Sequence, residues 1–179
     1  DLWSEGPAAG GTDVRRGLNL PAGVGVVDGD LVVADAWHHR LLRWDGVPTE
    51  SFAAPAQVLG QPDHDAVEPN RGADPTSTSF YWPFGFGLVA GTFWVADTGN
   101  RRVLGWRGTG FPVHDRPADL VLGQSSPTSR DDNRGEVLGP AGFRWPHAVT
   151  GDDETLYVAD AGDHRVVGWT PPPTGDIEP

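Results

Sequence analysis

The stretch Phe93-Trp-Val-Ala-Asp-Thr-Gly-Asn-Arg-Arg-Val-Leu-Gly-Trp106 consists of two short apolar runs around a polar turn. The first run ends at Asp97, and the second run begins after Arg102. Short runs that are rich in aromatic and β-branched residues, joined by a turn with Gly and Asn, predict a β-hairpin.

The same pattern occurs in Leu31–Trp44 and in Leu156–Trp169. The aspartates that end the first run stand at positions 35, 97 and 160, so the repeat steps are 62 and 63 residues. A second motif, Val58-Leu-Gly-Gln61, returns as Val121-Leu-Gly-Gln124. Three arginines, three tryptophans and three prolines keep the same spacing: Arg40, Arg102, Arg165, Trp44, Trp106, Trp169, Pro21, Pro83 and Pro146. A period that so many landmarks share predicts a repeat architecture.

Each unit contains four short runs of strand character. In the middle unit we predict strands over Phe84–Ala90, Thr92–Ala96, Arg102–Trp106 and Asp119–Leu122. Four short antiparallel strands that are bounded by turns and joined by long connections are typical of one blade of a β-propeller.

The repeating unit resembles the NHL repeat through its Pro-x-Gly/Ala start and its Val-Ala-Asp-x-x-Asn-x-Arg-Val-Leu end. Asp97–Leu104 is the closest copy, and Asp35–Leu42 and Asp160–Val167 are looser copies. The Val-Leu-Gly-Gln…Asn insertion resembles a bacterial subtype of NHL propeller. The resemblance implies an all-β propeller of NHL type with three four-stranded blades in this chain, which is half of a six-bladed ring. It says little about activity, because NHL propellers serve unrelated purposes.

We expect residues 1–179 to form a single propeller segment with units at about 18–79, 80–142 and 143–179. Propellers close with roughly four to eight blades, so three units leave a ring open. The third unit stops before its outer strand, whereas Asp1-Leu-Trp3 resembles Asp119-Leu-Val121. We therefore expect segment 1–17 to complete an outer strand, with Asp1–Ser4 added to a third blade of a second copy. The alternative is that both ends are cuts in a longer propeller.

The composition restricts the partners of the chain. It has 25 Asp and Glu residues against 13 Lys and Arg residues, a net charge of −12. An acidic surface opposes nucleic acid and anionic membranes, and it favours cationic ligands or divalent metals such as Ca or Zn. There is no Cys, which excludes a disulfide framework and thiol catalysis. The sequence is compatible with a secreted mature chain and with a cytoplasmic protein.

In a propeller of this kind, the second-to-third turns and the long inserts 61–80 and 124–143 lie on one face, around the mouth of the central channel. The residue after each leading proline, which is Ala22, Phe84 or His147, lies at the same mouth. Loops and channel mouths are the usual ligand sites of such scaffolds. The candidates for ligand contact are His147, His38, His39, His164, Asp163, Asn100 and Arg101.

Residues that recur in every unit are expected to be structural. Each repeat aspartate is predicted to accept hydrogen bonds from its turn and to pair with the arginine five residues later, which would brace the hairpin. The alternative is a set of channel carboxylates, but catalytic groups are usually unique in a ring. The bracing residues are Asp35, Asp97, Asp160, Arg40, Arg102 and Arg165. The insert residues Gln61, Gln124, Asn70 and Asn133 are expected to satisfy backbone groups.

His147 breaks the repeat, and a unique histidine at a channel mouth suits a metal ligand or a general base as well as an ordinary hydrogen-bonded role. Some six-bladed relatives are metal-dependent lyases or lactone hydrolases with calcium or zinc in the channel. That resemblance implies His147 with His39, His164 or Asp163 as metal ligands.

The leading hypothesis for function is a non-enzymatic scaffold that binds a protein or a small molecule on the insert-bearing face. The alternatives are a Ca- or Zn-dependent lyase or hydrolase, and an isolated or engineered propeller fragment without activity of its own. We expect a second copy of the chain, or the rest of a longer propeller, as its structural partner.

Overall fold

The structure is a computed structural model that describes residues 13–108 and 110–174. Its strands form three antiparallel sheets, each paired in chain order. Blade 1 contains β1 (Pro21–Val27), β2 (Asp30–Asp35), β3 (Arg40–Trp44) and β4 (Gln57–Leu59). Blade 2 contains β5 (Pro83–Val89), β6 (Thr92–Asp97), β7 (Arg102–Arg107) and β8 (Leu120–Leu122). Blade 3 contains β9 (Pro146–Gly151), β10 (Leu156–Asp160) and β11 (Arg165–Trp169).

The all-β prediction is confirmed, and the strands predicted for blade 2 match β5 to β8 to within a residue at each end. Blades 1 and 2 have the four strands predicted for each, and blade 3 has three strands among the described residues, in agreement with a third unit that stops before its outer strand. Residues 13–17 form a turn. The outer strand expected of Asp1–Ser4 lies outside the described residues.

Short 3₁₀ helices are the only helices in the parts of the chain that the structure describes, and none of its helices is long and apolar enough to cross a bilayer. They are η1 (Ala36–His38), η2 (Pro69–Gly72), η3 (Thr98–Asn100), η4 (Asp132–Gly135) and η5 (Ala161–Asp163). Three of them form the hairpin turns between the second and third strands. Each of these turns ends in a left-handed residue, which is His39, Arg101 or His164 with φ of 54 to 55°.

The first strands of the blades lie side by side, and glycine makes this contact close. A Cβ atom at Gly23 would lie 2.7 Å from the carbonyl oxygen of Phe84, and one at Gly85 would lie 2.6 Å from that of His147. A residue with a side chain would therefore push β1 away from β5, or β5 away from β9.

Apolar side chains fill the two junctions between the blades. The junction of blades 1 and 2 includes Val32, Leu41, Phe93, Val95, Leu104 and Trp106. The junction of blades 2 and 3 includes Trp94, Val103, Val149, Leu156, Val158 and Trp169. Every residue of β6 is buried, which is typical of a strand covered on both faces.

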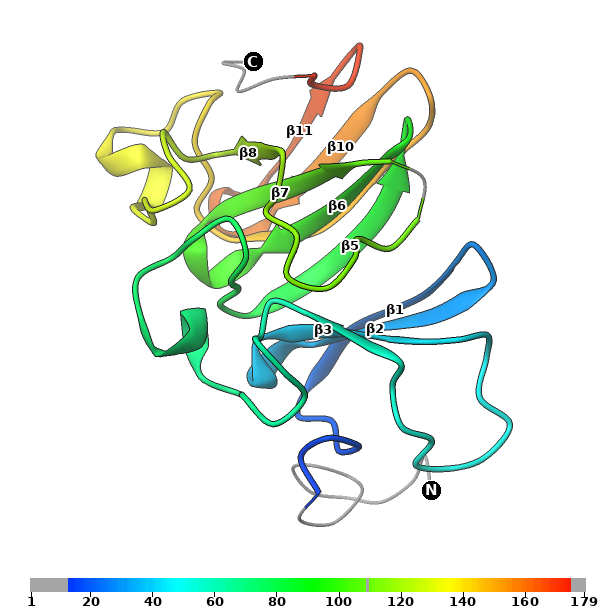
Figure 1. The fold of residues 1–179 in the computed structure, drawn as a ribbon. Coiled ribbons are helices and arrows are strands. Elements are labelled where there is room, and N and C mark those ends of the chain that lie inside the picture. The colour runs from blue at the N-terminus through cyan, green and yellow to red at the C-terminus, as the bar shows by residue number, and fades with distance from the viewer. Residues whose placement is uncertain (1–12, 109, 175–179) are drawn as a thin grey trace.

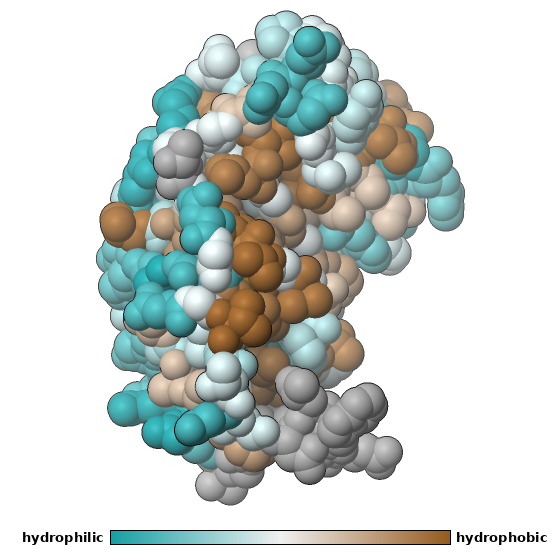
Figure 2. Space-filling view, turned by 90° about the vertical axis from the view of Figure 1, so that its right-hand side faces the viewer, coloured by the Kyte–Doolittle hydropathy of each residue, from teal (hydrophilic) through white to brown (hydrophobic). Residues whose placement is uncertain are grey.

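The insert segments and the 3₁₀ turns gather on the left of Figure 1, and the hairpin tip between β1 and β2 lies on the right. Figure 2 looks at the hairpin-tip side and shows a curved body that is hollowed on its right-hand side. Blade 2 is the middle of this arc, and neighbouring blades cover both of its faces. The outer face of blade 1 carries a third buried cluster of Val33, Leu42, Trp44 and Val58, whereas Tyr157 and Val166 on the outer face of blade 3 are exposed.

Candidate functional site

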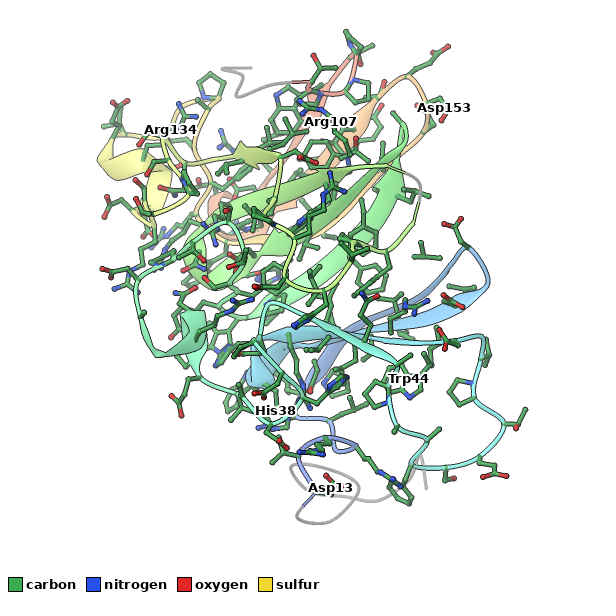
Figure 3. All side chains as sticks on the ribbon, viewed as in Figure 1. Asp13, His38, Trp44, Arg107, Arg134 and Asp153 are labelled. Carbon is green, nitrogen blue, oxygen red and sulfur yellow. The ribbon has the colours of Figure 1, made fainter. Side chains whose placement is uncertain are left out.

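The candidate site is the end of the blades that carries η1, η3, η5 and the inserts 61–80 and 124–143, which we call the insert face. Figure 3 shows His38 at this end of blade 1 and Trp44 at the other end of β3. All seven sequence-predicted ligand residues belong to the insert face or to the start of β9, so the question is which of their polar atoms are free.

The repeat aspartates and arginines form buried ion pairs. Asp97 is fully buried, and its Oδ2 atom accepts hydrogen bonds from Arg102 Nε at 2.7 Å and from Asn100 Nδ2 at 2.8 Å. Its Oδ1 atom accepts the backbone N–H of Tyr81 at 2.7 Å. Burial, the largest influence, raises the pKa of the Asp97 carboxyl, and Arg102 acts in the opposite direction. The same Nε-to-carboxylate contact joins Arg40 to Asp35 at 2.8 Å and Arg165 to Asp160 at 3.0 Å.

Each arginine also ties insert segments together. Arg102 Nη2 donates to the carbonyl oxygens of Thr76 at 2.8 Å and Ser79 at 3.0 Å, at the end of the first insert. Its Nη1 atom donates to the carbonyl oxygen of Pro127 in the second insert. Because all of these donors are used, the Asp–Arg pairs hold the insert face together and offer nothing to a ligand.

The polar atoms of Asn100, a predicted ligand residue, are also hydrogen-bonded within the protein. Asn100 is fully buried, and its Nδ2 atom donates to Asn70 Oδ1 at 2.8 Å while its Oδ1 atom accepts from Asn70 Nδ2 at 3.0 Å. His38 occupies the same position in blade 1, where it is buried and its Nδ1 atom lies 2.9 Å from Asp35 Oδ2. Both residues are therefore structural.

Asp163 is the third residue at this position, and its side chain is only 9% exposed. Its Oδ2 atom lies 4.0 Å from Arg165 Nη2 and, within the described chain, has no hydrogen-bond partner; Asn133 Oδ1, from the insert residue equivalent to Asn70, also has none. Asn133 and Asp163 therefore stand at the sequence positions of the Asn70–Asn100 contact, with one buried oxygen atom of each left without a partner.

His39 joins blade 1 to blade 2. Its Nδ1 atom accepts the backbone N–H of Trp82 at 3.2 Å, and its ring packs edge-on against Tyr81 at a centroid distance of 5.3 Å. Burial lowers the pKa of His39 to about 4, with a further contribution from His38. His39 is therefore neutral at pH 7 and acts as an acceptor in the junction.

Arg101 and His164 follow the other two turns. Arg101 donates from Nε to Asp132 Oδ1 at 2.5 Å and from Nη1 to the carbonyl oxygen of Gly99 at 2.6 Å, so its guanidinium is largely engaged. His164 is exposed. His147 is half-buried, and its ring packs against Phe84 at a centroid distance of 4.9 Å. Burial lowers the pKa of His147, opposed by Asp160.

The predicted metal ligands do not meet within the chain. Across residues 13–108 and 110–174, no group of three His, Asp or Glu side chains lies close enough to hold one metal ion. His39 is used between blades 1 and 2, while His147 and His164 lie in blade 3.

The insert glutamines support backbone groups. Gln61 Nε2 donates to the carbonyl oxygen of Glu68 at 2.9 Å and to that of His38 at 3.2 Å. Gln124 Nε2 donates to the carbonyl oxygens of Asp131 at 2.8 Å and Arg101 at 3.1 Å. Each glutamine therefore joins its insert to the turn of its own blade.

Aromatic side chains that the sequence reading did not select remain available on the insert face. Trp37 and Trp82 are 51% and 36% exposed, and their rings stack with centroids 6.4 Å apart. Trp145, at the position equivalent to Trp82, is 47% exposed, and the Arg144 guanidinium lies 5.5 Å from its ring centroid. The signal was the residue before each leading proline, which is large and apolar in every unit: Leu20, Trp82 and Trp145.

A shallow pocket of about 330 Å³ opens beside the first insert. Its lining includes Arg15, Asp63, His64 and Asp65. Arg15 binds both carboxylate oxygens of Asp65 at 2.6 Å, and Asp63 Oδ1 accepts two backbone N–H groups. Burial lowers the pKa of His64, and the nearby charges of Arg40 and His114 lower it further. The charged groups of this pocket are thus mostly paired with each other.

The three antiparallel sheets, each paired in chain order, have the arrangement of β-propeller blades. Residues 18–44, which comprise β1 to β3 of blade 1, match the NHL repeat family model. This match agrees with the resemblance drawn from the repeating motif and supports NHL-type propeller blades. No curated protein matches the chain.

Proposed function

We propose that this chain is a non-enzymatic binding scaffold whose insert face takes an extended segment of another protein. The observation that carries the proposal is the stacked, exposed pair of Trp37 and Trp82 from neighbouring blades, on a face whose polar side chains are committed to bracing. Exposed aromatic side chains provide large contact area at low entropic cost, and tryptophan is enriched among residues that dominate protein interfaces.

The backbone supports the same proposal. Trp82 has a φ of 54°, in the left-handed region where bulky residues are uncommon. Leu20, at the equivalent position in blade 1, has a φ of 49°. Strained conformations of this kind gather at ligand contacts, where the surrounding structure holds them in place.

A catalytic role has less support on this face. The three carboxylates that recur there are each paired with an arginine, and His38 and His39 already accept or share protons within the chain. General acid–base catalysis requires groups that can reach a substrate proton. The lyase or hydrolase alternative therefore has no observation in its favour within the described chain.

The test is selection of binding peptides from a random linear peptide library displayed on phage. We expect enriched peptides whose affinity falls at least tenfold in Trp82→Ala and in Trp37→Ala. Val113→Ala is the matched control, because Val113 is 66% exposed in the loop after β7 and is expected to leave binding unchanged. The proposal is wrong if no peptide is enriched, or if enriched peptides bind the two tryptophan variants as tightly as the parent protein. Circular dichroism of each variant checks that the fold is retained.

A further inference from the structure

Blade 3 contains an exposed tryptophan that already contacts a cation. The guanidinium carbon of Arg144 lies 5.5 Å from the centroid of the Trp145 ring, within the range of a cation–π contact. The Nε atom of Arg144 also lies 3.6 Å from Oδ2 of Asp132, which begins η4 in the second insert. This guanidinium is thus held between an aromatic face and the carboxylate of an insert.

Blade 2 has the same construction with an aromatic residue in place of the arginine. Trp82 stands one repeat before the tryptophan of blade 3, and Tyr81 stands one repeat before Arg144. A Cβ atom at Gly99, in the turn η3, would lie 2.6 Å from the Tyr81 ring. One at Gly162, in the turn η5, would lie 2.9 Å from Arg144 Cβ. Tyr81 and Arg144 therefore occupy the same place in their blades.

The blade 2 site has more aromatic surface and no cation of its own. The Tyr81 ring centroid lies 4.5 Å from that of Trp82, and Trp37 stacks on Trp82 from the other blade. Within residues 13–108 and 110–174, the structure has no cation over the ring of Trp37 or Trp82. His39, which accepts the Trp82 backbone N–H, is neutral at pH 7 because burial lowers its pKa to about 4.

The first insert provides a carboxylate beside these rings. Gln61 Nε2 donates to the carbonyl oxygens of Glu68 and His38, so Glu68 stands beside the turn that carries Trp37. Glu68 is exposed, and it stands one repeat before Asp131, the sequence neighbour of the aspartate that pairs with the blade 3 guanidinium. The site therefore has an insert carboxylate at nearly the same position of the repeat.

The one cation of the first insert is already engaged. Insert 61–80 contains four acidic residues and Arg71 as its only basic residue, apart from a histidine. Arg71 pairs with Asp115 at 2.8 Å and donates to the carbonyl oxygen of Thr78, also at 2.8 Å. A positive group from another molecule would therefore meet an acidic loop next to the aromatic faces, on a chain with a net charge of −12.

We propose that the protein segment bound at the insert face presents an arginine to the Trp37–Trp82 pair, with its guanidinium stacked on a tryptophan ring and paired with Glu68. This inference rests on the proposed binding function and names the side chain that the site recognises. Arginine suits the site better than lysine, because its planar guanidinium stacks on aromatic faces and is more weakly hydrated than an ammonium group. The contact of Arg144 with Trp145 and Asp132 shows the same chemistry in the same fold.

The test starts from the peptides that the phage selection enriches, which we expect to share an arginine. Each synthetic peptide is compared with a copy in which citrulline replaces that arginine, because citrulline keeps the shape of the side chain and lacks its charge. We expect the affinity, measured by isothermal titration calorimetry, to fall about tenfold on this replacement. A copy with lysine is expected to bind with an affinity between those two.

The carboxylate is tested with Glu68→Gln. The matched control is Glu154→Gln, which removes the same charge from an exposed residue between β9 and β10. We expect Glu68→Gln to weaken binding of the arginine peptide about threefold and to leave the citrulline peptide unaffected. Glu154→Gln is expected to leave the affinity for both peptides unchanged.

A third variant supplies the guanidinium from within the chain. Tyr81→Arg places an arginine before Trp82, as Arg144 stands before Trp145, and it should compete with the arginine of the peptide. Tyr81→Leu removes the same ring without adding a cation, and it is expected to bind the arginine peptide about tenfold more tightly than Tyr81→Arg does. Circular dichroism of both variants checks that the fold is retained.

The outcomes separate this inference from the binding function itself. Enriched peptides that depend on Trp82 but bind equally well with citrulline overturn the arginine proposal and leave the binding function in place. Equal affinities of Glu68→Gln and Glu154→Gln, or of Tyr81→Arg and Tyr81→Leu, overturn it as well. A selection that enriches no peptide overturns the binding function, and the inference with it.

Discussion

Arg102 provides the sharpest test of how the insert face is held together. Its side chain is fully buried and makes hydrogen bonds to Asp97, to the carbonyl oxygens of Thr76 and Ser79, and to that of Pro127. Arg102→Met keeps the length of the side chain and removes every donor. It leaves the Asp97 carboxylate buried without its positive partner, a loss that typically costs about 3–5 kcal/mol.

Arg165→Met is the matched control, because it removes the same repeat position in a different setting. The Arg165 side chain is 22% exposed and lies in blade 3, which has a free face. Water can replace part of its hydrogen bonds, so we expect a loss of about 1–2 kcal/mol. Arg102→Met is therefore expected to destabilise the chain by at least about 1 kcal/mol more than Arg165→Met does.

The assay is equilibrium urea unfolding followed by tryptophan fluorescence, with the free energy of unfolding taken from midpoint and slope. Adding Asp97→Asn to Arg102→Met removes the stranded charge and should recover part of the loss. Equal losses in the two arginine variants, or no recovery from Asp97→Asn, would refute the account of the pair as a buried brace. A cost below about 1 kcal/mol for Arg102→Met would refute it as well, because that is the value of an exposed ion pair.

Two further predictions concern a glycine and a histidine. Gly60 has a φ of +96°, and a Cβ atom there would lie 2.1 Å from the Phe80 ring. Gly60→Ala should therefore lower the melting temperature far more than the control Gly29→Ala, because a Cβ atom at Gly29 would touch nothing within 4 Å. Equal changes in melting temperature would contradict the packing argument. His39 has a folded-state pKa of about 4, below its ordinary value of 6.5, so the unfolded chain takes up a proton first as the pH falls. The stability that His39 contributes is therefore present above pH 6.5 and is lost between pH 6.5 and 4, by about 2 kcal/mol after allowance for solvent screening. His39→Asn, which suits the left-handed backbone, should flatten this part of the pH profile of unfolding, and an unchanged profile would show that His39 is not its source.

The sequence predicts the blades well because their information is local and repeated. The alternation around Asp97 and its copies sets the register of each hairpin, and the strands follow from it. The Asp–Arg contacts expected from strict recurrence are present in all three blades. Blade 3 has three strands among the described residues, since the third unit contains no copy of the Val-Leu-Gly-Gln motif that supplies the outer strand in the other two.

The candidate site was harder to predict because it depends on distances between blades. Asn100 and His38 look available on a polar turn, yet the first insert folds back over Asn100 and Asp35 takes up His38. The predicted metal ligands were likewise chosen by their position in the repeat, whereas a metal site requires side chains that lie close together in space. Trp82 was overlooked because a tryptophan in an apolar repeat is usually part of the core.

The division between shared and unshared positions bears on how a ligand would bind. Positions that all three units share, such as Asp97 and its equivalents, form the Asp–Arg pairs that brace the hairpins. The positions that differ lie at the rim and at the free face: Trp37 has glycine equivalents, and Thr150 replaces a glycine. A ligand bound between blades 1 and 2 would contact Trp37 and Trp82 together. Between blades 2 and 3, Gly99 stands in place of Trp37, so Trp145 has no tryptophan partner from the neighbouring turn. Binding is therefore expected at one site per chain, between blades 1 and 2.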